Sequence, residues 1–306
     1  MTYYITIFGI DIKLNPVAFT LPFGNGWNVY WYGILIALGF VLALAYGYKN
    51  AKRFCIDTDR MLDVILVTVP LAILCARAYY VIFDGVKLTS VADFFGLGDS
   101  RGFSGIAIYG GVIGAFSIGA LMCKLRKINI PDMFDLASLG FLIGQGVGRW
   151  GNFVNQEAYG GFTGSKWWGM VSNQTIYEMG SSKLVHPCFL YESIWCLIGL
   201  IVLHHLSKNR KFKGETFLMY CAWYGFGRGF IELLRTDSLM LGKIKVSCLL
   251  SFMLVLASIA LIIYFRNRAK DGGEYTEMFE NEEVEETEEE IKKTMIISEE
   301  ENVQGN

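Results

Sequence analysis

The sequence predicts an all-α polytopic membrane protein with about seven transmembrane helices. Hydrophobic residues make up 53% of the 306 residues and charged residues 18%, and the mean hydropathy is +0.38. One water-soluble core could not bury this much apolar surface. A helix needs about 20 apolar residues to cross a hydrocarbon core of ~30 Å. Seven stretches reach that length, near residues 28–48, 61–83, 103–123, 133–153, 187–207, 215–235 and 247–265.

Basic residues concentrate in alternate connections between these stretches, and they predict an orientation. Three or four of them follow the first, third, fifth and seventh stretch, as Lys124, Arg126 and Lys127 follow the third. The opposite connections hold fewer, for example Lys166 and Lys183 between the fourth and fifth stretch. Because short loops rich in Lys and Arg stay in the cytoplasm, we expect the N-terminus outside and the C-terminus in the cytoplasm.

Two segments outside the membrane are expected to carry structure of their own. Residues 1–27 have no basic start and no small-residue cleavage site, which favours an ordered outer arm over a removed signal peptide. The longest outer connection, at about 157–186, predicts a small extracellular head between the fourth and fifth spans. Within it, Trp167 and Trp168 are expected to be interfacial anchors, because indoles favour the headgroup level.

The end of the chain, residues 271–306, is acidic. It holds fourteen acidic residues against Lys292 and Lys293, and the rest of the chain carries a net charge of +10. Such runs are usually solvated and disordered. We therefore expect a disordered cytoplasmic tail without a catalytic role, after a membrane catalytic domain over 28–270.

Cysteines and histidines give no sign of a metal centre. The seven cysteines include no C-x-x-C pair, so neither a disulfide nor a zinc framework is indicated. His186 is the one histidine near the predicted outer face, which leaves an H-E-x-x-H metal hydrolase unsupported. We expect no metal, no cofactor and no nucleic-acid partner.

The most informative stretch runs from Gly148 to Glu157, where Arg149, two asparagines and a carboxylate close a long apolar segment. A charged side chain at membrane depth costs at least ~2.5–3.5 kcal/mol on insertion scales, so it usually has a partner or a function. Arg149 is therefore a candidate functional residue.

A second set of charges lies in the sixth stretch. Arg228, Glu232 and Arg235 are spaced four and three residues apart, which places them on one face of a helix. An ion pair neutralised inside a helix bundle is one interpretation. The excess positive charge favours another, an anion site, because the planar fork of arginine binds phosphate bidentately.

Smaller polar groups lie at the ends of other stretches. With the predicted orientation, residues 30–32, 77, 149–157, 186–192 and 228–237 share the outer half of the membrane. Tyr109 falls nearer the middle of its stretch, and Gly110-Gly111 would let a ligand or a helix approach closely. An arginine-lined chamber at the outer leaflet suits a phospholipid headgroup whose acyl tails remain in lipid.

The stretch from Gly148 to Gly160 resembles the signature of the prolipoprotein diacylglyceryl transferase family, G-R-x-G-N-F-x-N-x-E-x-x-G, and matches it at every fixed position. Supporting similarities cover about residues 28–237 in the family's order: Trp31-Tyr32-Gly33, the Arg77 region, Tyr109-Gly110-Gly111, His186-Pro187 with Leu190-Tyr191-Glu192, and Tyr224-Gly225 with Arg228, Glu232 and Arg235.

This resemblance implies a reaction and a place. Members of the family pass the diacylglyceryl group of phosphatidylglycerol to the lipobox cysteine thiol of prolipoprotein signal peptides, with a thioether and glycerol phosphate as products. The expected setting is the bacterial plasma membrane, with the active site towards the outer leaflet. The chemistry requires a thiolate, and a free thiol with a pKa near ~8.5 is mostly protonated at neutral pH.

The resemblance also implies roles for individual residues. Arg149 and Arg228 are expected to hold the phosphate, where charge develops in the transition state. Glu232 is expected to orient Arg228 or take part in proton transfer. The remaining candidates concern substrate binding: Asn152 and Glu157 as orienting and headgroup contacts, Gly160 as a turn that must stay small, Tyr32 at the lipid site, and Arg77 and Arg235.

One position departs from the family pattern. Many members have His-Gly-Gly where this chain has Tyr109-Gly110-Gly111, and that histidine is a candidate general base. A phenol titrates near ~10 and is a poor base at neutral pH unless an arginine lowers its pKa. Either the base lies elsewhere, or the residue at this position binds substrate rather than removing a proton. We favour the binding role.

Two other functions are compatible with arginines in a membrane. A lipid transporter or scramblase would need polar residues in the cytoplasmic halves of the same spans, yet residues 36–45, 113–122, 197–203 and 250–263 are almost wholly apolar. A non-catalytic lipid-binding receptor is the second alternative, and residue types alone do not exclude it. The unbroken signature favours the transferase.

Overall fold

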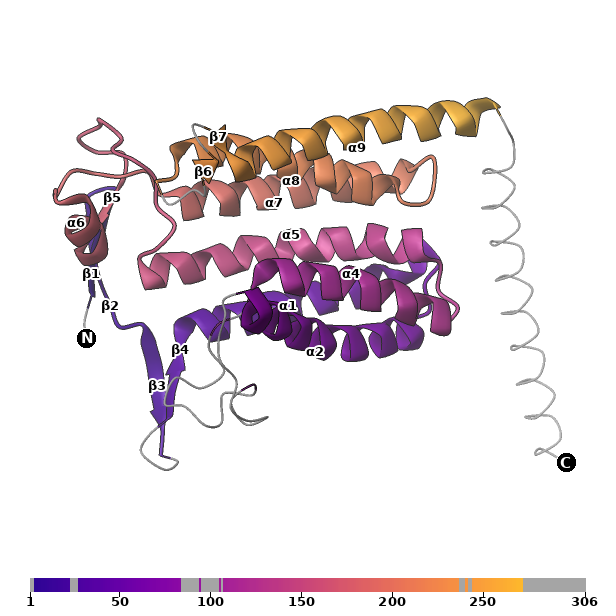
Figure 1. Cartoon of the computed structure of the whole chain (residues 1–306), viewed down its shortest axis with the longest axis horizontal. Coiled ribbons are helices and arrows are strands. Elements are labelled where there is room, and N and C mark those ends of the chain that lie inside the picture. Colours follow the sequence, from indigo (N-terminus) through magenta and orange to yellow (C-terminus); the bar gives the residue numbers. More distant parts are fainter. Residues whose placement is uncertain are drawn as a thin grey trace, which may run out of the picture. The chain divides into compact units, whose positions relative to one another are not determined.

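The computed structural model describes residues 3–22, 27–83, 94, 105, 107–236, 240–241 and 244–271, and most of them are helical (Figure 1). The long helices are α1 (Trp31–Asn50), α2 (Thr58–Phe83), α4 (Ile108–Leu125), α5 (Ile130–Asn155), α7 (Cys188–Leu206), α8 (Glu215–Leu234) and α9 (Val246–Asp271). Shorter helices are η1 (Ala51–Phe54), α6 (Asn173–Met179) and η2 (Ser207–Asn209).

Within the described residues, five helical segments are long and apolar enough to cross a membrane. They are Trp31–Phe54, Thr58–Phe83, Ile108–Leu125, Cys188–Asn209 and Val246–Ala269. The helices α5 and α8, at the places of the fourth and sixth predicted spans, have 26 and 20 residues and carry more polar groups. The prediction of a mainly helical, multi-pass membrane protein is confirmed at this level.

Two predicted spans begin later than expected, because their first residues have other backbone partners. Strand β4 (Trp27–Tyr30) pairs with β3 (Val17–Leu21), so α1 starts at Trp31 rather than at residue 28. Before α4, Gly105 has φ +81° and Ala107 N–H donates to the carbonyl of Ala76 at 3.1 Å. Tyr109 therefore lies in the first turn of α4, and its predicted place near the middle of a span is wrong.

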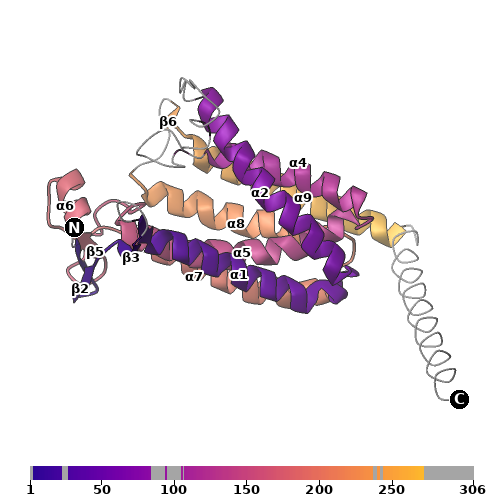
Figure 2. The same ribbon diagram turned by 90° about the horizontal axis from the view of Figure 1, so that it is seen from below.

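The chain forms two compact units, and α1 and α5 each pass from one to the other. In the unit made of residues 45–137, α2 packs along α4 (Figure 2). Glycines permit the close approach: a Cβ on Gly114 would lie 2.6 Å from Cys75 Cβ. Small residues at helix contacts allow the van der Waals packing that holds membrane helices together.

The other unit contains the described residues of 1–44 and 138–271, and in it α7 packs on α8 and α8 on α9 (Figure 1). Glycines again face the neighbouring helix. A Cβ on Gly225 would lie 3.0 Å from the carbonyl oxygen of Ser251, and one on Gly229 would lie 3.0 Å from the Phe252 ring. These contacts bring the backbone of α8 close to α9.

Strands from the start of the chain meet the segment between α5 and α7. Strand β1 (Tyr3–Ile7) pairs antiparallel with β2 (Ile10–Leu14) and with β5 (Met170–Ser172). Ile5 is fully buried there, in a cluster with Tyr159, Met170, Val185 and Phe189. A further pair joins β6 (Met240–Leu241) to β7 (Ile244–Lys245) before α9. Apart from Asp271, the predicted acidic tail lies outside the described residues.

Candidate functional site

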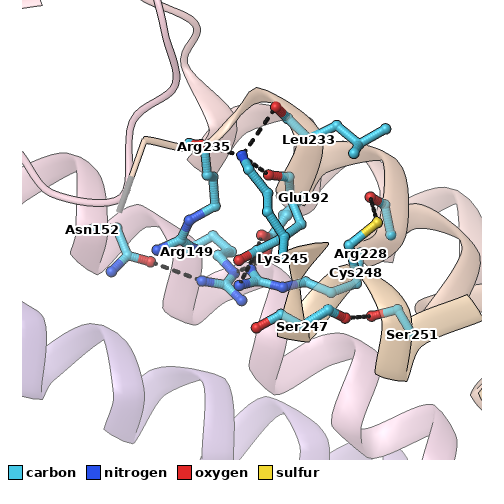
Figure 3. Close-up of polar contacts among 12 residues, drawn as sticks. Arg149, Asn152, Glu192, Arg228, Leu233, Arg235, Lys245, Ser247, Cys248 and Ser251 are labelled. Carbon is cyan, nitrogen blue, oxygen red and sulfur yellow. Dashed lines mark hydrogen bonds and ion pairs between the residues drawn. The ribbon is translucent and has the colours of Figure 1, made fainter. Parts of the chain in front are cut away.

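Glu192 of α7 lies between two arginines that come from different helices (Figure 3). Its Oε2 pairs with Arg149 Nε of α5, and its Oε1 pairs with Arg228 Nη1 of α8 at 2.5 Å. Arg228 Nη2 also pairs with Glu232 Oε2 at 2.5 Å. Two buried carboxylates and two largely buried guanidiniums thus alternate along one chain of ion pairs.

Burial explains why these charges are paired. The side chains of Glu192 and Glu232 are 4% and 2% exposed, and those of Arg149 and Arg228 are 21% and 19% exposed. Unpaired charges at this burial would be strongly destabilising, whereas the four together are neutral. The sequence predicted a face of α8 with excess positive charge, but Glu192 supplies a second carboxylate from α7. The prediction that Arg235 shares this helical face is wrong, because α8 ends at Leu234 and Arg235 follows it in an extended conformation. Arg235 still lies within electrostatic range of Arg149 and adds positive charge.

Each guanidinium is only partly used by these contacts. Arginine carries five N–H donors and no acceptor. Arg228 donates to Glu192 and to Glu232. Arg149 donates to Glu192 and to Asn152, and it contacts the Tyr224 hydroxyl. Both arginines therefore keep N–H groups with which an additional anion could be bound.

The signature residues after Arg149 form a hydrogen-bonded chain at the end of α5. Arg149 Nη1 donates to Asn152 Oδ1 at 3.3 Å, and Asn152 Nδ2 donates to Glu157 Oε1 at 2.9 Å. Gln156, with φ +59°, ends the helix in the left-handed region and turns the chain back. The exposed carboxylate of Glu157 is thereby fixed beside the same end of α5. The spacing R-x-x-N-x-x-x-x-E thus produces one connected polar edge.

Gly160 ties the start of α7 to the end of α8. Its N–H donates to the carbonyl of His186 at 2.9 Å, and the N–H of Gly161 donates to the carbonyl of Leu234 at 2.9 Å. A Cβ on Gly160 would lie 2.8 Å from both the Leu234 carbonyl oxygen and His186 Cβ. A side chain does not fit, which agrees with the expectation that this turn must stay small.

Lys245 closes the exposed carbonyl end of α8. Its Nζ donates to the carbonyls of Glu232 at 2.8 Å, Leu233 at 3.2 Å and Arg235 at 2.6 Å. A cation is favoured at a helix C-terminus, where unpaired carbonyls carry partial negative charge. Figure 3 shows Lys245 reaching these groups beside the cluster of Arg149, Arg228 and Glu192. Lys245 thus holds the turn of α8 that carries Glu232.

His186, next to the Gly160 turn, lies in a hydrogen-bonded group with Tyr191 and Trp168. Its Nδ1 lies 3.1 Å from the Tyr191 hydroxyl, which also accepts a hydrogen bond from Trp168 Nε1 at 2.7 Å. Burial lowers the pKa of the His186 imidazole below its usual range, because the charged form loses hydration. This shift favours the neutral form of the ring.

Eight of the ten candidate site residues come from the same compact unit: Tyr32, Arg149, Asn152, Glu157, Gly160, Arg228, Glu232 and Arg235. The Tyr32 ring lies against Gly151, which follows Arg149 by two residues in α5.

The other two candidates, Arg77 and Tyr109, belong to the unit made of residues 45–137. Arg77 is buried and donates to the carbonyls of Phe94 and Gly105, each at 3.0 Å. Tyr109 is 53% exposed in the first turn of α4. The described contacts of Arg77 are therefore structural ones within its own unit.

Three residues of the cluster are missing from the predicted set: Glu192, Tyr224 and Lys245. Glu192 had a readable signal, because it is the only acidic residue between Glu178 and Glu215 and interrupts an apolar helix. Such a carboxylate in a membrane segment indicates a partner or a function. Tyr224, which contacts Arg149, belongs to the Tyr224-Gly225 match to the family pattern, whereas Lys245 has no comparable signal.

Comparison with known proteins agrees with the signature. A profile of the prolipoprotein diacylglyceryl transferase family matches residues 16–264. The phosphatidylglycerol–prolipoprotein diacylglyceryl transferase of Pediococcus pentosaceus is 42% identical over 266 residues, which cover 84% of this chain and 92% of that protein. Its counterpart in Clostridium novyi is 40% identical over 258 residues, covering 82% and 95%. That of Clostridioides difficile is 38% identical over 263 residues, covering 85% and 98%.

Proposed function

Since the chain belongs to the prolipoprotein diacylglyceryl transferase family, we propose that it transfers the diacylglyceryl group of phosphatidylglycerol to the lipobox cysteine of prolipoproteins, the first step of lipoprotein maturation. One observation supports this most directly. Arg149 and Arg228 converge on Glu192 from two helices, which makes a paired guanidinium site in a largely apolar protein. Paired guanidiniums are well suited to a phosphate group.

The bonds of the reaction show where charge develops. The thiolate sulfur attacks the glyceryl carbon that bears the phosphate, so a C–S bond forms while the C–O bond to the phosphate breaks. The electron pair of the broken bond stays on the phosphate oxygen. A phosphodiester with one negative charge thereby becomes glycerol phosphate with two. The thiol proton passes to a base and then to water or to the product.

The arginines act on that second charge. As the C–O bond lengthens, the leaving oxygen becomes more negative, and N–H donors fixed around it stabilise the transition state more than the ground state. Glu192 fixes the guanidinium of Arg149 at Nε and that of Arg228 at Nη1. Glu232 holds Arg228 at Nη2. The carboxylates thus orient the clamp before the lipid arrives.

The polar edge after Arg149 suits the rest of the headgroup. Glu157 is an exposed carboxylate whose oxygen already accepts from Asn152 at 2.9 Å, so it can accept further hydrogen bonds from the hydroxyls of a glycerol headgroup. Tyr32 and Arg235 are assigned to the same substrate site, and Gly160 to the turn beside it. Arg77 and Tyr109 are assigned as further substrate contacts, with Tyr109 a hydrogen-bond partner rather than the base.

The proposal includes a topology. If α5 and α8 cross the bilayer with the five more apolar segments, the chain spans it seven times, and the distribution of Lys and Arg places the N-terminus outside. The arm of residues 1–27 and the head at 157–186 then share the outer side, which agrees with the pairing of β1 with β5. The site faces the outer leaflet of the bacterial plasma membrane, where prolipoprotein signal peptides emerge.

A transfer assay tests the function. Purified protein in phosphatidylglycerol vesicles, labelled in the diacylglyceryl group, is mixed with a lipobox peptide or with its Cys→Ser variant. We expect label in the cysteine peptide alone, since the thiolate is the nucleophile. Lipid binding without transfer to either peptide would contradict the transferase and favour a receptor. Movement of labelled lipid between leaflets without transfer would favour a scramblase.

A further inference from the structure

Two tryptophans join α7 to α8 through a reciprocal contact outside the charged cluster. Trp195 Nε1 donates to the carbonyl of Trp223 at 2.9 Å, and Trp223 Nε1 donates to the carbonyl of Trp195 at 3.1 Å. The two indole rings stack with centroids 4.4 Å apart and planes 17° apart. Each residue is thus donor, acceptor and stacking partner of the other.

Each tryptophan also packs on a glycine of the opposite helix, and the two glycines occupy equivalent positions. Both helices contain W-x-x-x-G, as Trp195 to Gly199 in α7 and Trp223 to Gly227 in α8. A Cβ on Gly199 would meet the indole nitrogen of Trp223, and one on Gly227 would meet that of Trp195. We call these four residues the tryptophan clasp.

The clasp resists sliding of one helix along the other. A slip of one helical turn, about 5.4 Å, would break both hydrogen bonds and drive an indole against a residue larger than glycine. In a bilayer no hydrophobic effect holds helices together, so packing and interhelical hydrogen bonds set the register. An indole N–H without a partner in hydrocarbon would also be costly.

The clasp lies within one helical turn of the charged cluster on both helices. Glu192 is three residues before Trp195, and Arg228 directly follows Gly227. The register that the clasp fixes is therefore the register in which Glu192 Oε1 reaches Arg228 Nη1 at 2.5 Å. A displaced α8 would leave Glu192 with Arg149 alone.

Ser193, the residue after Glu192, fixes the position of α7 relative to α5. Ser193 Oγ donates to the carbonyl of Gly146 at 2.9 Å and accepts from Trp150 Nε1 at 3.2 Å. Trp150 is the neighbour of Arg149 in sequence. One turn of α7 thus carries the shared carboxylate, a contact that sets α5 and a contact that sets α8.

We propose that Trp195 and Trp223 are positioning residues for the transfer reaction: their reciprocal clasp sets the α7–α8 register in which Glu192 holds Arg228 for the phosphate. This inference rests on the proposed function. It assigns to the clasp an effect on the rate of the chemical step, beyond an effect on folding. Small displacements of catalytic groups have large effects on rate, since a 1 Å error can cost about 100-fold.

The test uses variants that remove the donor and keep an aromatic ring. Four variants are assayed for transfer from phosphatidylglycerol to a lipobox peptide. Trp195→Phe and Trp223→Phe remove the indole N–H, and benzothienylalanine at each of the two positions removes it while keeping the bicyclic shape. We expect kcat to fall about 10-fold or more at unchanged KM for the peptide. Trp167→Phe, at a side chain 72% exposed, is the matched control and keeps the wild-type rate.

A double-mutant cycle separates positioning from folding. Glu192→Asp shortens the side chain by one methylene group and keeps the carboxylate. It is combined with Trp195→Phe, and both kcat and the thermal midpoint are measured for every variant. If Trp195 acts through Glu192, the two losses in kcat are not additive. Wild-type kcat in the clasp variants, or additive losses that follow the thermal midpoints, would overturn the inference. Absence of transfer by the wild-type protein would instead remove the proposed function, and the inference with it.

Discussion

Arg149 and Arg228 share one counter-ion. They are 79 positions apart in sequence and belong to α5 and α8, yet they pair with the two different oxygens of the Glu192 carboxylate. Neither guanidinium can rotate without losing that contact. The arrangement fixes the distance between two positive groups, which is the property that a phosphate clamp requires.

Replacing either arginine by lysine tests whether the fork or only the charge is needed. Arg149→Lys and Arg228→Lys keep a positive charge and lose the planar set of donors. We expect transfer to fall about 100-fold or more in each, and to be abolished in Arg149→Ala and Arg228→Ala. The measurement is kcat for peptide diacylglyceryl transfer by protein shown to be inserted in the membrane.

Arg126→Lys is the matched control for these variants. Arg126 pairs with Asp63 at 3.3 Å, and both side chains are about half exposed, at 48% and 44%. Exposed pairs contribute about 0–1 kcal/mol, so this variant should keep its activity. Retained turnover in Arg149→Ala or Arg228→Ala would refute the clamp.

Neutralising the shared carboxylate should affect both arginines at once. Glu192→Gln keeps the shape of the side chain but leaves two guanidiniums with the single carboxylate of Glu232. Breaking a buried ion pair from one side costs about 3–5 kcal/mol. We expect a lower thermal midpoint and a loss of transfer of at least about 100-fold. Asp63→Asn, at the half-exposed carboxylate that pairs with Arg126, should resemble wild type in both measurements; a fully active Glu192→Gln would contradict the role of Glu192.

The Gly160 turn should not tolerate a methyl group. In Gly160→Ala the new Cβ would stand 2.8 Å from the Leu234 carbonyl, which is backbone and cannot turn aside. Overpacking of this kind typically costs about 1–3 kcal/mol. We expect a lower thermal midpoint together with reduced transfer, because the ends of α7 and α8 separate. Gly144→Ala, where no atom lies within 4 Å of the new Cβ, is the control, and equal behaviour of the two variants would count against this account.

The role of Tyr109 can be separated from proton removal by the pH dependence of the rate. If its hydroxyl only binds substrate, Tyr109→Phe loses one hydrogen bond of about 0.5–1.5 kcal/mol, a loss of roughly 2- to 10-fold in rate. The shape of the pH–rate profile should then stay the same, and Tyr109→His should remain active. A profile that loses its dependence on a base in Tyr109→Phe would show that the phenol titrates in the reaction.

The acidic tail should be dispensable. A chain truncated after Lys270 retains all of the helices except the last residue of α9, and it keeps every residue of the charged cluster. We expect wild-type kcat and KM in the transfer assay. Loss of activity with normal insertion would contradict the assignment of residues 271–306 as an appendage.

Local patterns predicted those parts of the site that depend on one helix. Arg228 and Glu232 are one turn apart, and the structure pairs them at 2.5 Å, as the spacing indicates. The Arg149, Asn152 and Glu157 chain likewise lies within nine residues. Glu192 could not be placed this way, because its partners lie on two other helices and only tertiary packing brings them together.

The strands show the same limit in the fold. The pairing of Ile5 with Ser172 joins segments that are far apart in sequence. The residues of a short strand do not indicate which other strand it pairs with. The late start of α4 also has a tertiary cause. Ala107 donates to the carbonyl of Ala76 on α2, and that contact holds the chain extended where apolar composition alone would continue a helix.

The most direct test of the central claim follows both products of one reaction. Phosphatidylglycerol labelled separately in the diacylglyceryl group and in the glycerol headgroup is incubated with the protein and a lipobox peptide. We predict one equivalent of glycerol phosphate released for each thioether-linked peptide formed, and neither product with Arg149→Ala or Arg228→Ala. Peptide labelling without glycerol phosphate, or glycerol phosphate release that survives loss of either arginine, would contradict the account.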